Sequence, residues 1–289
     1  MKELDLEYKI TGKGEQILVI ESGIGGAFYD WYALINDIKE YFTIILYNRA
    51  GYGNSKVLNQ SRTTKNIAKE LNWLLDNIGI KDKFILMGHS FGGLCVQQYV
   101  KMYPNKIKGV VLVDSTSYNF KQLYNLNIPV MNSLISIDKM VEGNINSSKK
   151  SKKELKNQCK NIISGYKKIL SENEIVDCEE FLSNPLLYKT MADEFENWEK
   201  SSKSIKEMGE FPDIPLKIIA RDNKVAEKYW INLNIPIEEA ILYENKWREL
   251  QVELSKLCSK GELIIAENSD HEVYLDRPDS LVHCLKSLI

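Results

Sequence analysis

Ser90 stands among glycines that could turn its hydroxyl group into a nucleophile. The segment GHSFGG spans residues 88–93 and lies between a short apolar run and a stretch with helical character. A tight strand-to-helix turn here would raise the serine Oγ above the carboxyl edge of a sheet, beside the N–H groups that begin the helix. Gly88 and Gly92 lack the Cβ atoms that would collide in such a turn. The pattern predicts a nucleophile on a strained backbone.

Glycine-rich turns also bind phosphate groups, but this sequence lacks the residues for that. It contains no G-x-x-x-x-G-K-[ST] pattern and no G-x-G-x-x-G turn after its first predicted strand. A phosphate-binding loop is therefore not indicated.

A serine hydroxyl needs a base to accept its proton, and the chain has three histidines. His89 lies inside the turn, where its side chain would point away from Ser90, and His283 lies in the last predicted helix. His271 follows a predicted strand at 263–266, in a loop expected at the same sheet edge as the serine. His271 is the predicted general base.

The elements that must position these residues follow an alternating pattern. Predicted strands occupy residues 17–20, 42–47, 84–87, 109–113, 216–220 and 262–266, and predicted helices occupy 66–78, 94–102 and the end of the chain from Pro278. Strands that are apolar on both sides and separated by helices predict a mostly parallel sheet with helices on both faces. The fold class is therefore α/β.

Residues 119–211 interrupt this pattern, because they contain helix-like polar segments and no comparable strand. We therefore expect an α/β core formed by residues 1–118 and 212–289. The segment 119–211 would be a helical cap or lid inserted over the pocket.

Composition limits the classes of function. The 289 residues carry a formal net charge of −2, with an isoelectric point near 6.1, which disfavours nucleic-acid binding. No apolar run approaches the roughly 20 residues of a membrane span, and the first residues lack the apolar core of a signal peptide. The five cysteines are scattered and suggest neither disulfides nor a zinc site. We expect a reduced, cytoplasmic protein that acts on a small molecule, with its oligomeric state left open.

The chain resembles the α/β-hydrolase family over nearly its whole length. Besides GHSFGG, it contains VIESGIGG (19–26), similar to the family's oxyanion loop, and YNRAGYGNS (47–55), similar to its Tyr-Asp-Arg-x-Gly-x-Gly-x-Ser segment. The ending ENSDHEVYLDRPDSL (267–281) resembles the histidine loop and the final helix that begins with Pro. Two positions depart from the pattern: Ser22 replaces a common His, and Asn48 replaces the usual Asp. Both positions mainly support loops in the family.

The resemblance implies oxyanion-hole donors at the backbone N–H groups of Phe91 and Ile24. Removal of such a donor typically costs about 10²–10³ in rate. A serine nucleophile also separates this chain from the haloalkane dehalogenases and epoxide hydrolases of the fold, which use Asp.

The acid that orients the histidine has two candidates. Asp222 follows the strand 216–220, where the family's acid most often lies, although the usual spacing falls on Lys224. Asp114 ends a strand expected beside the one that leads to the serine. Its run LVDSTS (112–117) resembles a subgroup of small serine hydrolases without a dependable later Asp. We favour Asp114 and keep Asp222 as the alternative.

These features predict a serine hydrolase that cleaves an ester of a small or medium acyl group through an acyl-enzyme, with no metal or organic cofactor. One alternative is an aminopeptidase or amidase of the same fold, which would need a cap acid such as Glu194 or Glu196 to hold a substrate amine. Another is a ligand-binding protein of this fold with little turnover.

Overall fold

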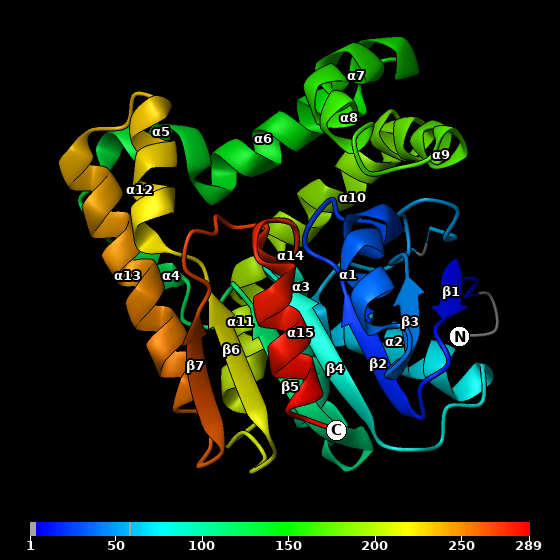
Figure 1. Cartoon of the computed structure of the whole chain (residues 1–289). Helices are drawn as coiled ribbons and strands as arrows, with labels where there is room; N and C mark the ends of the chain where they lie inside the picture. The colour runs from blue at the N-terminus through cyan, green and yellow to red at the C-terminus, as the bar shows by residue number, and fades with distance from the viewer. Residues whose placement is uncertain (1–3, 58) are drawn as a thin grey trace.

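The computed structural model describes residues 4–57 and 59–289, and a seven-stranded sheet forms its centre (Figure 1). The sheet order is β1-β3-β2-β4-β5-β6-β7. Only β1 is antiparallel to its neighbour, and the other adjacent strands pair in parallel. The predicted mostly parallel sheet is confirmed. The strands are β1 (Tyr8–Thr11), β2 (Gln16–Glu21), β3 (Phe42–Tyr47), β4 (Phe84–His89), β5 (Ile107–Val113), β6 (Leu216–Ala220) and β7 (Gly261–Ile265).

Strand β1 was missed by the sequence pattern. It lies at the edge of the sheet, where Tyr8 and Ile10 are 46% and 48% exposed. A short edge strand with exposed apolar side chains lacks the buried face that gives the other strands their signature.

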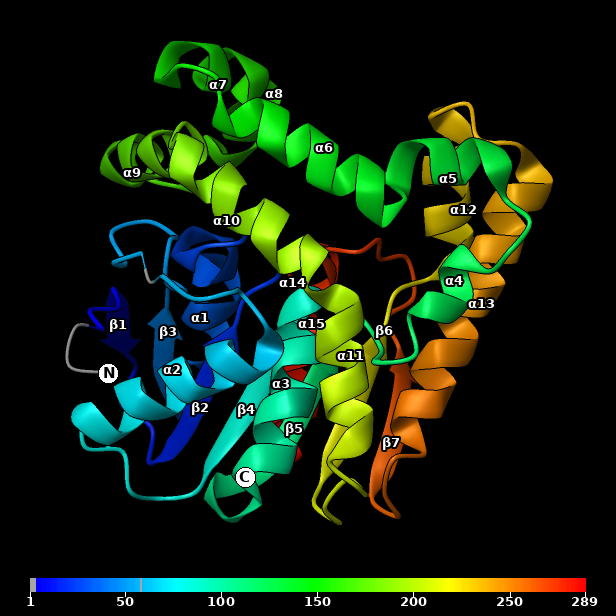
Figure 2. The same ribbon diagram turned by 180° about the vertical axis from the view of Figure 1, so that it is seen from behind.

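Helices cover both faces of the sheet (Figures 1 and 2). One face carries α1 (Tyr32–Ile38), α14 (Val273–Asp276) and α15 (Pro278–Lys286); the other carries α2 (Thr64–Asn77), α3 (Phe91–Met102), α11 (Trp198–Glu207) and α13 (Ile237–Ser255). Strand β4 shows the consequence, because Phe84 and Leu86 join one hydrophobic cluster while Ile85 and Met87 join the other. Burial on both sides explains why this strand is apolar throughout.

The chain between β5 and β6 is helical. The helices within residues 137–196 lie beyond the carboxyl ends of the parallel strands, whereas α11 runs beside α3 on one face of the sheet (Figure 2). Helices α12 (Asn223–Asn232) and α13 follow β6. The remaining helices before α11 are α4 (Lys121–Tyr124), α5 (Pro129–Ile135), α6 (Ile137–Ser148), α7 (Lys152–Gln158), α8 (Lys160–Tyr166), α9 (Glu172–Leu182) and α10 (Pro185–Glu196); two short 3₁₀ helices are η1 (Phe28–Trp31) and η2 (Pro104–Lys106).

Within residues 4–57 and 59–289, no helix combines the length and the apolar composition of a membrane span.

Candidate active site

Ser90 alone forms the turn between β4 and α3. Its backbone angles, φ 52° and ψ −123°, fall outside the regions that most residues adopt. The expected strain is therefore present. A Cβ atom at Gly88 would lie 2.7 Å from the carbonyl oxygen of Gly92, and one at Gly92 would lie 2.3 Å from that of Glu21. The two glycines allow the chain to close this tightly.

Asp114 follows β5, which pairs directly with β4, so the aspartate and Ser90 leave neighbouring strands at the same edge. The backbone of Asp114 is left-handed, with φ 38°, a conformation in which Asp is enriched. Its carboxylate is fully buried, and Oδ2 lies 2.6 Å from Nδ1 of His271. The structure thus brings together Asp114 and the predicted base.

Asp222 is engaged elsewhere. It is the N-cap of α12, where its Oδ1 accepts a hydrogen bond from the Lys224 amide at 2.9 Å. Its Oδ2 accepts one from the Asn268 amide at 3.0 Å. The Asp222 carboxylate therefore stabilises the start of α12 and the loop at Asn268. Among the described residues, it makes no hydrogen bond with His271.

Three residues that the sequence analysis missed surround Asp114. Arg221, directly after β6, donates to Asp114 Oδ2 at 2.8 Å, and the indole of Trp247 donates to Oδ1 at 2.8 Å. Glu244, which is also buried, accepts two hydrogen bonds from the same guanidinium at 2.7 and 3.1 Å. The only local signal was an arginine at the end of an apolar strand. The sequence around Glu244 and Trp247 on α13 contains no comparable signal.

These contacts shift two pKa values in opposite directions. Burial alone would raise the pKa of Asp114, but the charge of Arg221 and hydrogen bonds from His271 and Trp247 hold that pKa far below its ordinary 3.8. Burial acts to lower the pKa of His271, yet the hydrogen bond and the charge of Asp114 outweigh it and raise that pKa above 6.5. With Nδ1–H donated to the carboxylate, the neutral imidazole presents Nε2 as an acceptor.

The raised pKa of His271 leads to a prediction about pH. A base must be unprotonated, so kcat/KM for a neutral ester is expected to fall about tenfold per pH unit below this pKa. The midpoint should lie above 6.5, the ordinary value for histidine. Initial rates between about pH 5 and 9 would measure it, with circular dichroism as a control for folding. Full activity at the acidic end would contradict the role of this imidazole.

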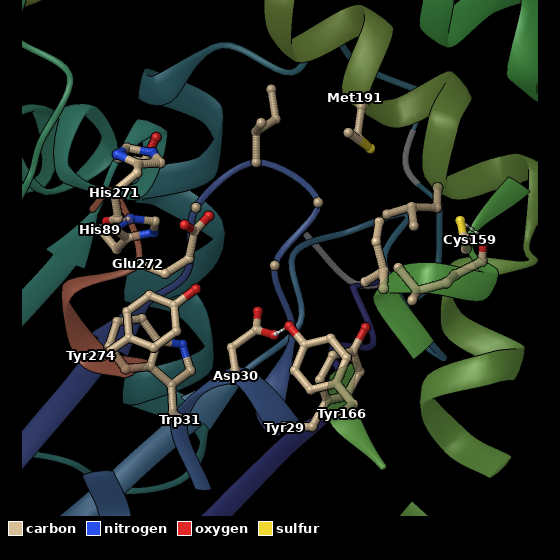
Figure 3. Close-up of a pocket in the computed structure, with 18 of the residues that line it drawn as sticks. Tyr29, Asp30, Trp31, His89, Cys159, Tyr166, Met191, His271, Glu272 and Tyr274 are labelled. Atoms are coloured by element: carbon tan, nitrogen blue, oxygen red, sulfur yellow. Dashed lines mark hydrogen bonds between the residues drawn. The ribbon is translucent and has the colours of Figure 1, made fainter. Parts of the chain in front are cut away.

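Ser90 and His271 lie where two cavities meet. The cavities have volumes of about 410 and 340 Å³, and both are lined by Ile24, Ser90, His271 and Glu272. Figure 3 shows the larger one, with His271 and His89 at one end. Among the described residues the serine hydroxyl makes no hydrogen bond. Such contacts are often long in enzymes without substrate.

The smaller cavity has largely aromatic walls. It is lined by Phe120, Tyr124, Phe195, Trp198, Tyr229, Trp230, Tyr243 and Trp247, among others. These side chains come from segments before and after β6 in the chain. Because the walls are aromatic, the cavity suits a flat or branched apolar group.

The two predicted oxyanion donors flank the serine. Phe91 is the first residue of α3, and Ile24 lies in the turn after β2. In the described part of the chain, the Ile24 amide donates no hydrogen bond, whereas the next amide, of Gly25, donates to the hydroxyl of Tyr52 at 2.9 Å. The first amides of a helix likewise have no partner within it. Neither N–H group therefore has a hydrogen-bond partner in the described part of the chain.

The two departures from the family pattern have structural partners. The hydroxyl of Ser22 accepts a hydrogen bond from the Trp31 indole at 2.9 Å, directly before the turn at 23–26. The side chain of Asn48 donates to Glu7 at 2.6 Å. Each residue supports a loop.

Arg49 links the core to helix α10. Its guanidinium contacts Glu21 and Glu194 at 2.8 Å each and donates to the carbonyl oxygens of Ser22 and Gly23 at 2.6 and 2.9 Å. All three charged side chains are buried. Because Glu194 is paired in this way, it is not free to hold a substrate amine.

The other residues considered at the sequence level lie apart from the reacting groups. Glu196 lines a different cavity, beside Arg62. His283 is exposed on α15. His89 is buried, with Nε2 3.0 Å from the carbonyl oxygen of His271, and burial together with the nearby charge of His271 lowers its pKa to about 3. His89 is therefore neutral at physiological pH and braces the loop that carries His271.

Comparison with known proteins agrees with this architecture. The "Uncharacterized protein YqjL" of Bacillus subtilis (strain 168) is 32% identical over 103 residues, covering 36% of this chain and 41% of that protein. The "Cis-3-alkyl-4-alkyloxetan-2-one decarboxylase" of Shewanella oneidensis is 27% identical over 117 residues, covering 39% and 36%. The chain thus spans well under half the length of these curated relatives. The crystal structure of the enol-lactonase from Burkholderia xenovorans LB400 aligns over 99% of this chain and 96% of that one, with a TM-score of 0.69 at 13% identity, which shows a shared fold.

The family model described as alpha/beta hydrolase fold matches residues 16–160, half of the chain. That range contains β4, the turn at Ser90 and α3, together with β2 and β5, the two neighbours of β4 in the sheet. The chain therefore belongs to the alpha/beta hydrolase fold family.

Proposed function

We propose that this protein is a serine hydrolase that cleaves a carboxylic ester through an acyl-enzyme. The observation that carries the proposal is the 2.6 Å contact between the buried Asp114 carboxylate and Nδ1 of His271. It leaves Nε2 as a base in a loop that lines the same two cavities as Ser90.

The reaction would run in two stages. Ser90 Oγ attacks the ester carbonyl while His271 takes its proton, and the amides of Phe91 and Ile24 stabilise the oxyanion. The carbon–oxygen bond to the alcohol breaks as His271 returns the proton to the leaving oxygen. Water, deprotonated by the same imidazole, then attacks the acyl-enzyme and releases the acid. No step requires a metal ion or an organic cofactor.

We also propose that residues 119–211 act as a cap on a core formed by 1–118 and 212–289. Two observations support this: Tyr166 and Met191, from α8 and α10, line the larger cavity, and Phe120 and Trp198 line the smaller one. Residues of this segment would therefore determine which esters fit.

Labelling with a fluorophosphonate probe tests the proposal. We expect the wild-type protein to react at one position, identified as Ser90 by mass spectrometry, and Ser90→Ala to remain unlabelled. A His283→Ala variant serves as a control, because this histidine is exposed and lines neither cavity. A folded wild-type protein that does not react would favour the ligand-binding alternative.

A further inference from the structure

The larger cavity contains a carboxylate that the ester reaction does not use. Asp30, in η1, is 6% exposed, and its oxygens accept hydrogen bonds from the Ala27 amide at 2.8 Å and the Tyr166 hydroxyl at 2.5 Å. Among the described residues it has no cationic partner. Buried carboxylates are normally paired with a positive charge, so Asp30 is an exception that needs an explanation.

A second group in this cavity lacks a partner. Tyr274 is only 5% exposed, and its hydroxyl makes no hydrogen bond to any described residue. Figure 3 shows this hydroxyl directed toward the space between Glu272 and Asp30. This oxygen is not among the fully enclosed polar atoms of the described residues, because it borders the cavity, so it is free to pair with a ligand atom there.

The charge of the cavity favours one kind of ligand. Its described lining residues include two acids, Asp30 and Glu272, and no Lys or Arg. Burial, with a contribution from the charge of Glu272, raises the pKa of Asp30 to about 6. A cation beside Asp30 would offset this cost of burial.

We propose that the larger cavity binds a protonated amine on the substrate, held by Asp30, Glu272 and the Tyr274 hydroxyl. The hydroxyl would accept a hydrogen bond from the ammonium group, and each carboxylate oxygen can accept one more. This inference rests on the proposed function, because the cavity meets the aromatic one at Ser90. The substrate is then an ester with an ammonium group on one side of the scissile bond and an apolar group on the other.

Two pairs of esters of equal shape test the preference. Phenyl 4-(dimethylamino)butanoate is compared with phenyl 5-methylhexanoate, and 2-(dimethylamino)ethyl phenylacetate with 3-methylbutyl phenylacetate. The first pair places the amine on the acyl side of the ester, and the second pair places it on the alcohol side. In one of the two pairs, we expect kcat/KM to be about 10- to 100-fold higher for the amine-bearing ester than for its neutral counterpart. This is the effect of one charge-assisted hydrogen bond. Equal values within both pairs would overturn the inference.

Variants assign the preference to this cavity. In Asp30→Asn, the amine-to-neutral ratio of kcat/KM is expected to fall toward one. Asp177→Asn makes the same charge change on α9, outside this cavity, and should keep the ratio. If Asp30→Asn does not fold, Glu272→Gln, at an exposed position, and Tyr274→Phe provide the same comparison. An unchanged ratio in these variants would contradict the assignment.

A binding measurement separates this inference from the proposed function. Calorimetric titration of Ser90→Ala with 4-phenylbutylammonium and with 4-phenylbutan-1-ol requires no catalysis. Tighter binding of the ammonium, weakened by Asp30→Asn, supports the amine site even if no ester is cleaved. Equal binding of the two compounds refutes it even if Ser90 proves to be a nucleophile.

Discussion

Asp114→Asn is expected to lower kcat for a chromogenic ester by about 10⁴-fold, the cost of leaving a catalytic histidine in the wrong tautomer. The asparagine amide cannot stabilise the imidazolium that forms when His271 takes the serine proton. It also removes the carboxylate that pairs with Arg221 at 2.8 Å. Steady-state kinetics would measure the loss, with circular dichroism to confirm folding.

Asp222→Asn is the matched control for this experiment. It makes the same change at the other candidate acid, which caps α12. Asn is also a good N-cap, but its single acceptor oxygen can keep only one of the two hydrogen bonds that Asp222 accepts, so a small loss of stability is expected. The value of kcat should stay within about tenfold of wild type, far from the 10⁴-fold loss above. If Asp222→Asn lost activity while Asp114→Asn kept it, our assignment of the acid would be wrong.

Arg49→Met is expected to destabilise the fold by about 3–5 kcal/mol, the typical cost of removing one partner from a buried ion pair. The methionine would leave Glu21 and Glu194 without their shared cation, and both are buried. Burial already raises the pKa of Glu21 despite the charge of Arg49. Urea unfolding would measure the change.

Lys203→Met removes one positive charge from an exposed pair, with Glu207 at 3.8 Å. Such pairs contribute little, so this control should unfold near the wild-type midpoint. A double variant, Arg49→Met with Glu194→Gln, should recover part of the lost stability, because it leaves one fewer unpaired charge. If Arg49→Met unfolded like the control, the contacts of Arg49 would have no net stabilising effect.

The parallel strands and the turn at Ser90 were predictable because their signals are local. The strands that are buried on both faces carry uninterrupted apolar runs, and the predicted limits 42–47 and 216–220 coincide with β3 and β6. The glycines around the serine are required because a Cβ atom at Gly88 or Gly92 would collide with nearby backbone. The edge strand β1 has no such signal, since its side chains face solvent.

The sequence favoured Asp114 as the acid but left Asp222 as an alternative. Asp114 and Asp222 each lie within two residues of the carboxyl end of a parallel strand, and backbone geometry separates their roles. A left-handed residue directs one carboxylate to the imidazole, while an extended N-cap directs the other to amide groups. The sequence also could not predict the partners of the buried arginines, because Glu194 lies 145 residues from Arg49 along the chain.

The pairing of Arg49 with Glu194 has a consequence for how compounds reach and leave Ser90. Lifting α10 would separate a buried guanidinium from its carboxylate and disturb the turn after β2, whose carbonyl groups at Ser22 and Gly23 accept hydrogen bonds from Arg49. Widening that spares this pair has to come from other elements that line the cavities, such as α8 and α9 around the larger one and α12 and α13 around the smaller one. In the proposed reaction, product departure would then respond to substitutions in those helices, while the buried ion pair holds α10 in place.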